Sequence, residues 1–102
     1  MLELRPNCEW CGKSLSPNAD DARICTYECT FCADCVERVL FNVCPNCGGG
    51  FERRPIRPLT EWRPGVSQGK QPAATQRKEL KWPRDEVVEF VKRLRNIEPR
   101  NR

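Results

Sequence analysis

The clearest helical pattern in the first half of the chain begins at Asp34. Val36, Val39 and Leu40 lie at positions i, i+3 and i+4, which place them on one face of a helix. Asp34 has the side chain of an N-cap residue. We expect this helix to end near Phe41, because a proline and three consecutive glycines follow within nine residues.

A second helical pattern covers about residues 83–97. Pro83 suits a first helical turn, and cationic side chains gather toward the C-terminal end, where the helix dipole favours them. The apolar positions form one stripe, made of Val87, Phe90, Val91, Leu94 and Ile97. This pattern predicts an amphipathic helix whose stripe is covered by the rest of the chain, by a second copy or by a partner.

The remaining segments show little periodicity. "LEL" at 2–4 alternates apolar and charged residues, which is a weak strand signal. Residues 53–81 contain four prolines and no apolar period, so they are interpreted as a flexible, basic linker. The chain therefore divides into a cysteine-rich domain at 1–52, a linker at 53–81, and a helix with its tail at 82–102.

Composition limits how such a small domain can be stabilised. Only 38% of the residues are hydrophobic and 31% are charged, so a large apolar core is excluded. Eight cysteines, all in the first half, indicate that the core is held by a cross-link or a metal. The sequence shows no signal-peptide pattern and no apolar run long enough to span a membrane. We therefore expect a cytoplasmic protein without a membrane partner, in which thiols stay reduced and bind metal rather than form disulfides.

Charge is divided unevenly between the two halves. Residues 1–52 hold 4 basic and 8 acidic side chains, whereas residues 53–102 hold 14 basic and 6 acidic ones. The formal balances of −4 and +8 add to the net charge of +4. This asymmetry indicates an acidic head and a basic tail with separate roles.

The cysteine spacing is the strongest chemical signal. The order is C-x2-C-x13-C-x3-C-x2-C-x2-C-x8-C-x2-C, which makes four close pairs. Zn²⁺ takes four tetrahedral ligands, and C-x2–4-C pairs are its usual sequence unit. The spacing predicts two structural zinc sites per chain; a single metal, an iron–sulfur cluster or disulfides are the alternatives. The eight ligands are Cys8, Cys11, Cys25, Cys29, Cys32, Cys35, Cys44 and Cys47.

The pairs can share metals in sequential or in crossed order. A six-residue helix after Cys35 climbs about 9 Å. Only Asn42 and Val43 would then remain to bring Cys44 back to the same metal. Crossed ligation avoids this reversal and is favoured. It joins Cys8, Cys11, Cys32 and Cys35 at one site and Cys25, Cys29, Cys44 and Cys47 at the other.

The crossed pattern resembles a RING-type cross-brace zinc finger. Phe31 directly precedes the fifth ligand, the last pair reads "CPNC", and a short helix follows the sixth ligand. Two positions depart from that family. Cys29 stands where most RING fingers have histidine, and Gly48 follows the last ligand without the nearby arginine of many active ubiquitin ligases. The resemblance implies a small α+β finger, RING-like or treble-clef-like, more than it implies ligase activity.

A longer resemblance covers about residues 1–58. "MLELRPNCEWCGKSL", "DARICTYECTFCADCVERVL", "CPNCGG" and "RRPIRP" are similar to a small cysteine-rich bacterial family, domain-of-unknown-function family 1272 (DUF1272). The resemblance implies zinc binding without an established activity.

The sites predict binding rather than catalysis. Four thiolates leave no open position on zinc, and the chain has no histidine, so we expect no enzyme. The favoured hypothesis is a non-catalytic adaptor for an unknown protein partner, which could dock on Trp10 or on the stripe of Val87, Phe90, Val91 and Leu94. The first alternative is nucleic-acid binding through a basic tail that includes Arg53, Arg54, Arg57, Lys78 and Lys81. RING-type ligase activity is a weaker alternative, and the sequence leaves the oligomeric state open.

Overall fold

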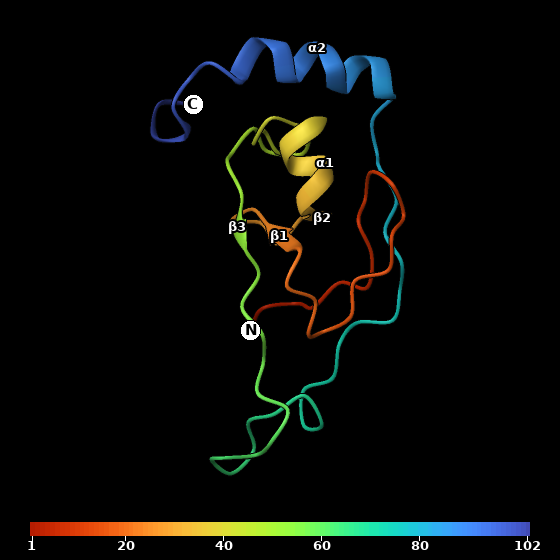
Figure 1. Cartoon of the computed structure of the whole chain (residues 1–102), viewed down its shortest axis with the longest axis vertical. Coiled ribbons are helices and arrows are strands. Elements are labelled where there is room, and N and C mark those ends of the chain that lie inside the picture. Colours follow the sequence, from red (N-terminus) through yellow and green to blue (C-terminus); the bar gives the residue numbers. More distant parts are fainter.

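Three short strands form one antiparallel sheet in the order β2-β1-β3 (Figure 1). The computed structural model describes all residues from 1 to 102. The strands are β1 (Ala22–Ile24), β2 (Thr30–Cys32) and β3 (Glu52–Arg53). Ala22 pairs with Cys32, and Ile24 pairs with Glu52 on the other side. The strand expected at 2–4 does not form, although Leu4 is buried there.

Helix α1 (Ala33–Arg38) follows β2 without a connecting loop. Cys32 therefore occupies the N-cap position in an extended conformation, and the predicted cap at Asp34 is wrong. The helix is also shorter than expected, because Phe41 and Asn42 adopt positive φ angles that turn the chain away. The turn directs the chain from α1 into the last cysteine pair.

The core is small and rich in sulfur. Six of the fifteen residues in the main buried cluster are cysteines. Within it, the rings of Phe31 and Phe51 pack edge to face, with their centroids 5.3 Å apart. Leu40 and Val43 are fully buried beside them. The apolar side chains therefore surround the cysteines rather than forming a separate core.

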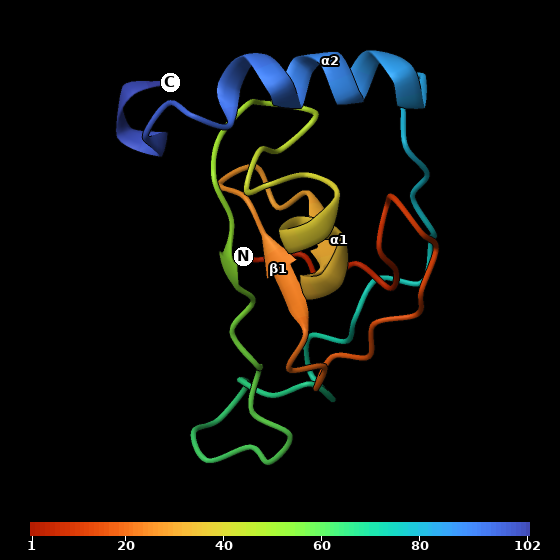
Figure 2. The ribbon, with the colours of Figure 1, turned by 45° about the horizontal axis from the view of Figure 1, so that its top comes forward.

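Helix α2 (Arg84–Leu94) lies across one end of the molecule, over α1 and the loop after it (Figures 1 and 2). Val87 and Val91 are only 2% and 3% exposed and belong to the main cluster. The stripe is thus covered by the head of the same chain. Ile97 lies beyond the helix and is partly exposed, so the helix is shorter than the predicted 83–97. A short 3-10 helix, η1 (Pro99–Asn101), ends the chain, and none of the helices is long and apolar enough to cross a membrane.

The segment at 53–81 follows a defined course instead of being solvated along its length. After a loop at the far end of the molecule, it returns beside the N-terminal segment (Figures 1 and 2). The backbone N–H of Ala74 donates to the carbonyl of Leu4 at 3.0 Å. The side chain of Asn7 exchanges two hydrogen bonds with the backbone of Lys78, at 2.8 and 3.1 Å. The basic tail therefore wraps around the acidic head.

Candidate metal centres

The first cysteine group combines two pairs that are far apart in sequence. Cys8 and Cys11 come from the N-terminal loop, and Cys32 and Cys35 come from the junction of β2 and α1. All four sulfur atoms lie within 4.8 Å of one another. The Sγ atoms of Cys11 and Cys32 are 3.9 Å apart, which is far beyond the S–S distance of about 2.05 Å in a disulfide. The group could hold one metal ion.

The second group contains three thiols within the same limit. Cys25 follows β1, and Cys44 and Cys47 lie in the loop after α1; their sulfur atoms are within 4.8 Å of one another. Cys29 lies beside Cys25 and Cys44 but outside this limit. Its thiol and that of Cys44 hydrogen bond to Cys25 and lower the pKa of Cys25 to about 3. This group could also hold a metal ion, with Cys29 adjacent to it.

The two groups are built from alternate cysteine pairs. The first and third pairs meet in one group, and members of the second and fourth pairs meet in the other. This is the arrangement that crossed ligation requires. Helix α1 explains it, because the helix carries the chain away from Cys35 before the turn at Phe41 and Asn42.

The thiols influence one another's protonation. Hydrogen bonds to Cys25 and Cys29 raise the pKa of Cys44. In the first group, burial raises the pKa values of Cys8 and Cys35. Thiols this close cannot all ionise alone, whereas a divalent cation would stabilise them as thiolates.

A buried carboxylate links the two loops that carry the cysteine pairs Cys8/Cys11 and Cys44/Cys47. Glu9 lies between the first two ligands and is only 5% exposed. Its carboxylate accepts hydrogen bonds from the side chain of Asn46, at 3.2 Å, and from the backbone N–H of Thr30, also at 3.2 Å. The guanidinium of Arg5 forms an ion pair with the same carboxylate at 3.6 Å. Burial raises the pKa of Glu9. Sequence analysis gave this residue no role, because a single charged residue in a loop carries no periodic signal.

The basic tail contacts the loop that carries Cys8 and Cys11. Arg84 donates to the carbonyl of Trp10 at 2.7 Å, and its guanidinium lies 4.3 Å from the centroid of the Trp10 ring. Arg77 donates to the carbonyl of Gly12. Trp10 is therefore half-buried between the head and the tail, rather than standing free as a docking anchor.

Helix α2 contacts the loop of the second group. Trp82 donates its indole N–H to the side chain of Asn46 at 3.0 Å. Gly48 adopts a φ angle of +79°, and a Cβ atom there would lie 3.1 Å from Leu94 and 3.5 Å from Phe90. Leu94 and Phe90, two of the partner-binding candidates, thus face this loop.

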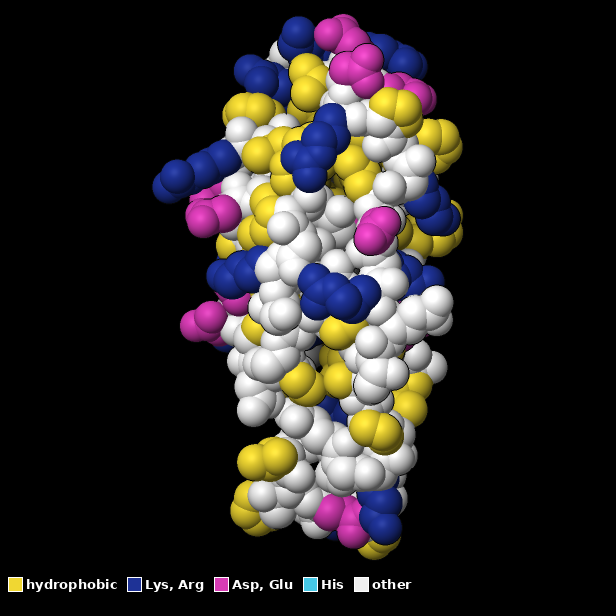
Figure 3. All heavy atoms as spheres, turned by 90° about the vertical axis from the view of Figure 1, so that its right-hand side faces the viewer, with side chains coloured by type: hydrophobic (Ala, Val, Ile, Leu, Met, Phe, Trp, Pro, Cys, Tyr) yellow, Lys and Arg dark blue, Asp and Glu magenta, His cyan; other side chains and the backbone are white.

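Two of the five nucleic-acid candidates have their side chains engaged inside the protein. Arg54 is fully buried, and Arg57 donates to the carbonyls of Leu2 and Gln71, both at 2.6 Å. The side chains of Arg53, Lys78 and Lys81 are exposed. Figure 3 shows Lys and Arg side chains spread along one face of the molecule rather than gathered in one patch.

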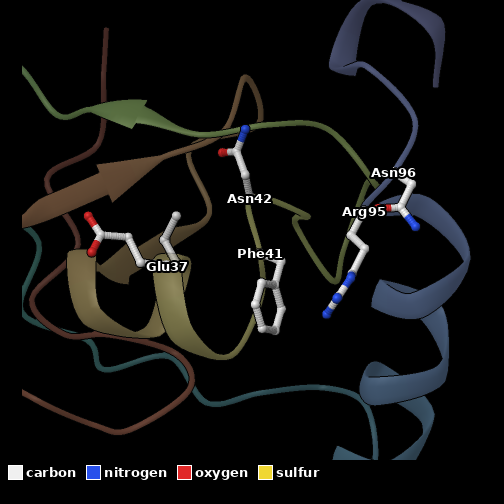
Figure 4. A pocket seen from close by; sticks show the side chains of 6 residues that line it. Glu37, Phe41, Asn42, Arg95 and Asn96 are labelled. Carbon is white, nitrogen blue, oxygen red and sulfur yellow. The ribbon is translucent and has the colours of Figure 1, made fainter.

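A hollow lies between the C-terminal ends of the two longer helices (Figure 4). The guanidinium of Arg95 lies 4.3 Å from the centroid of the exposed Phe41 ring. The rest of its wall is lined by Val36, Glu37, Asn42 and Asn96. None of the cysteines borders this hollow, so it is separate from the metal-binding groups.

These features define a small cysteine-rich α+β protein with two groups that could bind metal. The chain belongs to the DUF1272 family, described as proteins of unknown function, whose family model matches residues 1–57. It is 53% identical to the uncharacterized protein R02474 of Rhizobium meliloti (strain 1021) over 77 residues, which are 76% of this chain and 84% of the relative. A match of that length extends beyond the end of the family model and includes part of the tail. No solved structure matches the chain.

Proposed function

We propose that the chain is a non-catalytic zinc-binding module with two zinc ions and a RING-like crossed arrangement of ligands. The observation that carries this proposal is that cysteines from alternate pairs come together in two separate clusters. Zinc–sulfur bonds of about 2.3 Å place neighbouring sulfurs of a tetrahedral site about 3.8 Å apart. The 3.9 Å between Cys11 and Cys32 fits that spacing.

The proposed role of each zinc is structural. Four thiolates fill the coordination sphere and leave no position for water or substrate. The chain contains no histidine, which catalytic zinc sites commonly use together with an open position. In the second site, Cys29 is the proposed fourth ligand, because it already lies beside Cys25 and Cys44.

The module's proposed task is to present a surface to a protein partner. The two loops are joined by Glu9 and Asn46, and the tail crosses them; together they form a scaffold for such a surface. Nucleic-acid binding has less support, because Arg54 and Arg57 are occupied by backbone carbonyls. Ligase-like activity also has less support, because Gly48 takes the position next to the last ligand.

Metal stoichiometry and cobalt substitution test the zinc proposal. We expect two zinc ions per chain in freshly purified, reduced protein by elemental analysis. In cobalt-loaded protein, Cys8→Ser and Cys32→Ser should weaken one thiolate charge-transfer band, and Cys25→Ser and Cys44→Ser should weaken the other. Loss of the same cobalt site in Cys8→Ser and Cys25→Ser would establish sequential ligation, and one or no zinc per chain would refute the two-site proposal.

The nucleic-acid alternative has its own measurement. A mobility shift on mixed-sequence DNA or RNA should fall steeply with salt if exposed cations such as Arg53, Lys78 and Lys81 contact phosphates. The adaptor proposal expects no such shift at physiological ionic strength.

A further inference from the structure

The loop at the end of the molecule opposite α2 carries an unusual concentration of exposed apolar side chains. We call residues 56–71 the distal loop; Figures 1 and 2 show it at that end. Four of the ten large hydrophobic residues that are exposed in the whole protein lie within it. They are Ile56 at 45%, Leu59 at 72%, Trp62 at 81% and Val66 at 51% exposure.

Hydrogen bonds join the two ends of the distal loop. The N–H of Gln68 donates to the carbonyl of Pro58 at 2.8 Å, and Arg57 donates to the carbonyl of Gln71 at 2.6 Å. The side chain of Gln68 also donates to Asn18 of the head at 2.6 Å. The loop is thus fixed to the head at its base.

Polar groups inside the distal loop form hydrogen bonds with one another. Ser67 is only 4% exposed, and its N–H donates to the side chain of Gln71 at 3.3 Å. Gln71 in turn donates to the carbonyl of Gly65 at 2.6 Å, and the N–H of Gly65 donates to Glu61 at 2.9 Å. Polar groups therefore hold the loop's shape, and the apolar side chains are left on its outside. Such preorganisation lowers the entropic cost of binding.

The charge around the exposed side chains is positive. Arg63 and Lys70 are exposed in the loop, and neither forms an ion pair. Glu61, the only acidic residue of the loop, accepts the hydrogen bond from Gly65. The half of the chain that contains the loop has a formal balance of +8. A ligand that complements the distal loop would offer an apolar region to its exposed side chains and negative charge to Arg63 and Lys70.

We propose that the distal loop is a contact site for the surface of an anionic lipid bilayer. Leu59, Trp62 and Val66 enter the interfacial region, where tryptophan is favoured, while Arg63 and Lys70 contact lipid phosphates. A projecting end can approach a flat surface without interference from the rest of a molecule that is 46 Å long and 26 by 19 Å across. A contact of this kind is peripheral and needs no membrane-spanning helix.

Area and charge favour this ligand over a second copy. Leu59, Trp62 and Val66 together offer on the order of 400 Å² of apolar surface, about half of the roughly 800 Å² per partner in a standard protein interface. Pairing of two loops would also bring Arg63 and Lys70 of one copy near the same cations of the other. Anionic lipid, by contrast, is attracted by both cations and has no fixed outline to match.

Vesicle sedimentation with the metal-loaded, full-length protein tests the proposal. Vesicles of phosphatidylcholine with about a third phosphatidylglycerol should carry the protein into the pellet, and pure phosphatidylcholine should bind it much less. The Leu59→Ser/Trp62→Ser variant should partition about tenfold more weakly or worse, because it loses two exposed apolar side chains. Arg63→Gln/Lys70→Gln should weaken binding to the anionic vesicles alone.

Matched variants separate the loop from general effects. Val88→Ser changes an exposed apolar residue of α2, and Arg38→Gln/Lys92→Gln removes two exposed cations elsewhere; both should bind nearly as the parent does. Unchanged zinc content in every variant shows that the head stays folded. Absence of binding to anionic vesicles, or equal binding by Leu59→Ser/Trp62→Ser and its parent, overturns the proposal. Concentration-dependent dimerisation that this variant abolishes, without vesicle binding by the parent, would assign the loop to a second copy instead.

Discussion

At the scale of single residues, Arg54 shows how this chain uses a buried cation. Its side chain is 1% exposed and has no ion-pair partner, yet its guanidinium donates to the carbonyls of Arg5, at 2.9 Å, and Ser16, at 2.8 Å. Burial lowers the pKa of Arg54, which reflects the cost of holding the charge away from water. The residue fastens β3 and the start of the tail to the N-terminal loops.

We predict that Arg54→Lys will lower the free energy of unfolding of the metal-loaded protein by about 1–3 kcal/mol. Lysine keeps the charge but lacks the planar fork that reaches two carbonyls, so one of them loses its donor. Arg53→Lys is the control, because Arg53 is the exposed neighbour and surface changes usually stay within about 0.5 kcal/mol. Urea denaturation followed by circular dichroism measures both; equal midpoints would show that Arg54 is not the fastening point.

Sequence reasoning succeeded where a residue's role follows from chemistry and spacing. The cysteine spacing predicted groups of thiols that could hold metal, and the short helix after Cys35 predicted which pairs would meet. Arg54 and Glu9 could not be interpreted in the same way. Their roles depend on carbonyl and amide groups that the fold brings from distant loops, and nothing in a run such as "RRPIRP" shows that one arginine is buried and its neighbour exposed.

At the scale of elements, periodicity predicted the helices but not the sheet. The helical spacing of apolar residues that begins at Val36 predicted α1. The same kind of spacing, which includes Val87 and Val91, predicted α2. The strands contain only three, three and two residues, which is too short for an alternating pattern to appear. Their pairing becomes visible only in the structure, where Ala22 pairs with Cys32 and Ile24 pairs with Glu52.

Helix α2 provides a test of element docking with a matched pair of substitutions. Val91 is 3% exposed against the head, whereas Val88 of the same helix is 42% exposed. Val91→Asp buries a carboxylate without a partner, so we predict a loss of about 3 kcal/mol or more and a lower helix signal. Val88→Asp introduces the same side chain on the solvent side and should remain within about 0.5 kcal/mol of the parent. Similar circular dichroism and stability in the two variants would contradict the observed docking of α2.

At the scale of the whole molecule, the two halves of opposite charge form one structure. The charge asymmetry of the sequence suggests separate roles for the two halves, and the prolines and missing apolar period at 53–81 predict a flexible linker. In the structure, Arg57, Arg77 and Arg84 donate to backbone carbonyls of the head, so the tail is joined by hydrogen bonds that need no acidic side chain. Neither charge counting nor apolar periodicity detects a contact of this type.

The tail is joined to the head at the loops that carry the cysteine pairs. Arg84 is held by Trp10, Trp82 by Asn46, and Leu94 lies against Gly48. All three of these head residues lie within or directly beside a cysteine pair. Helix α2 has 11 residues, and isolated helices of that length are marginal in water. Loss of metal should therefore release the helix as well as the loops.

We predict that a strong chelator under reducing conditions will abolish the near-ultraviolet signal of the aromatic residues and the helical signal of α2 in one transition. Structural zinc contributes on the order of 10–16 kcal/mol in small fingers at neutral pH, which is comparable to the whole stability of about 5–15 kcal/mol of an ordinary domain. The head should consequently unfold, and α2 would lose the surface that covers Val87 and Val91. Circular dichroism at both wavelengths during titration with chelator measures the coupling, and re-addition of zinc should restore both signals together. A helical signal that survived after the aromatic signal had disappeared would show that the tail folds independently of the metal centres.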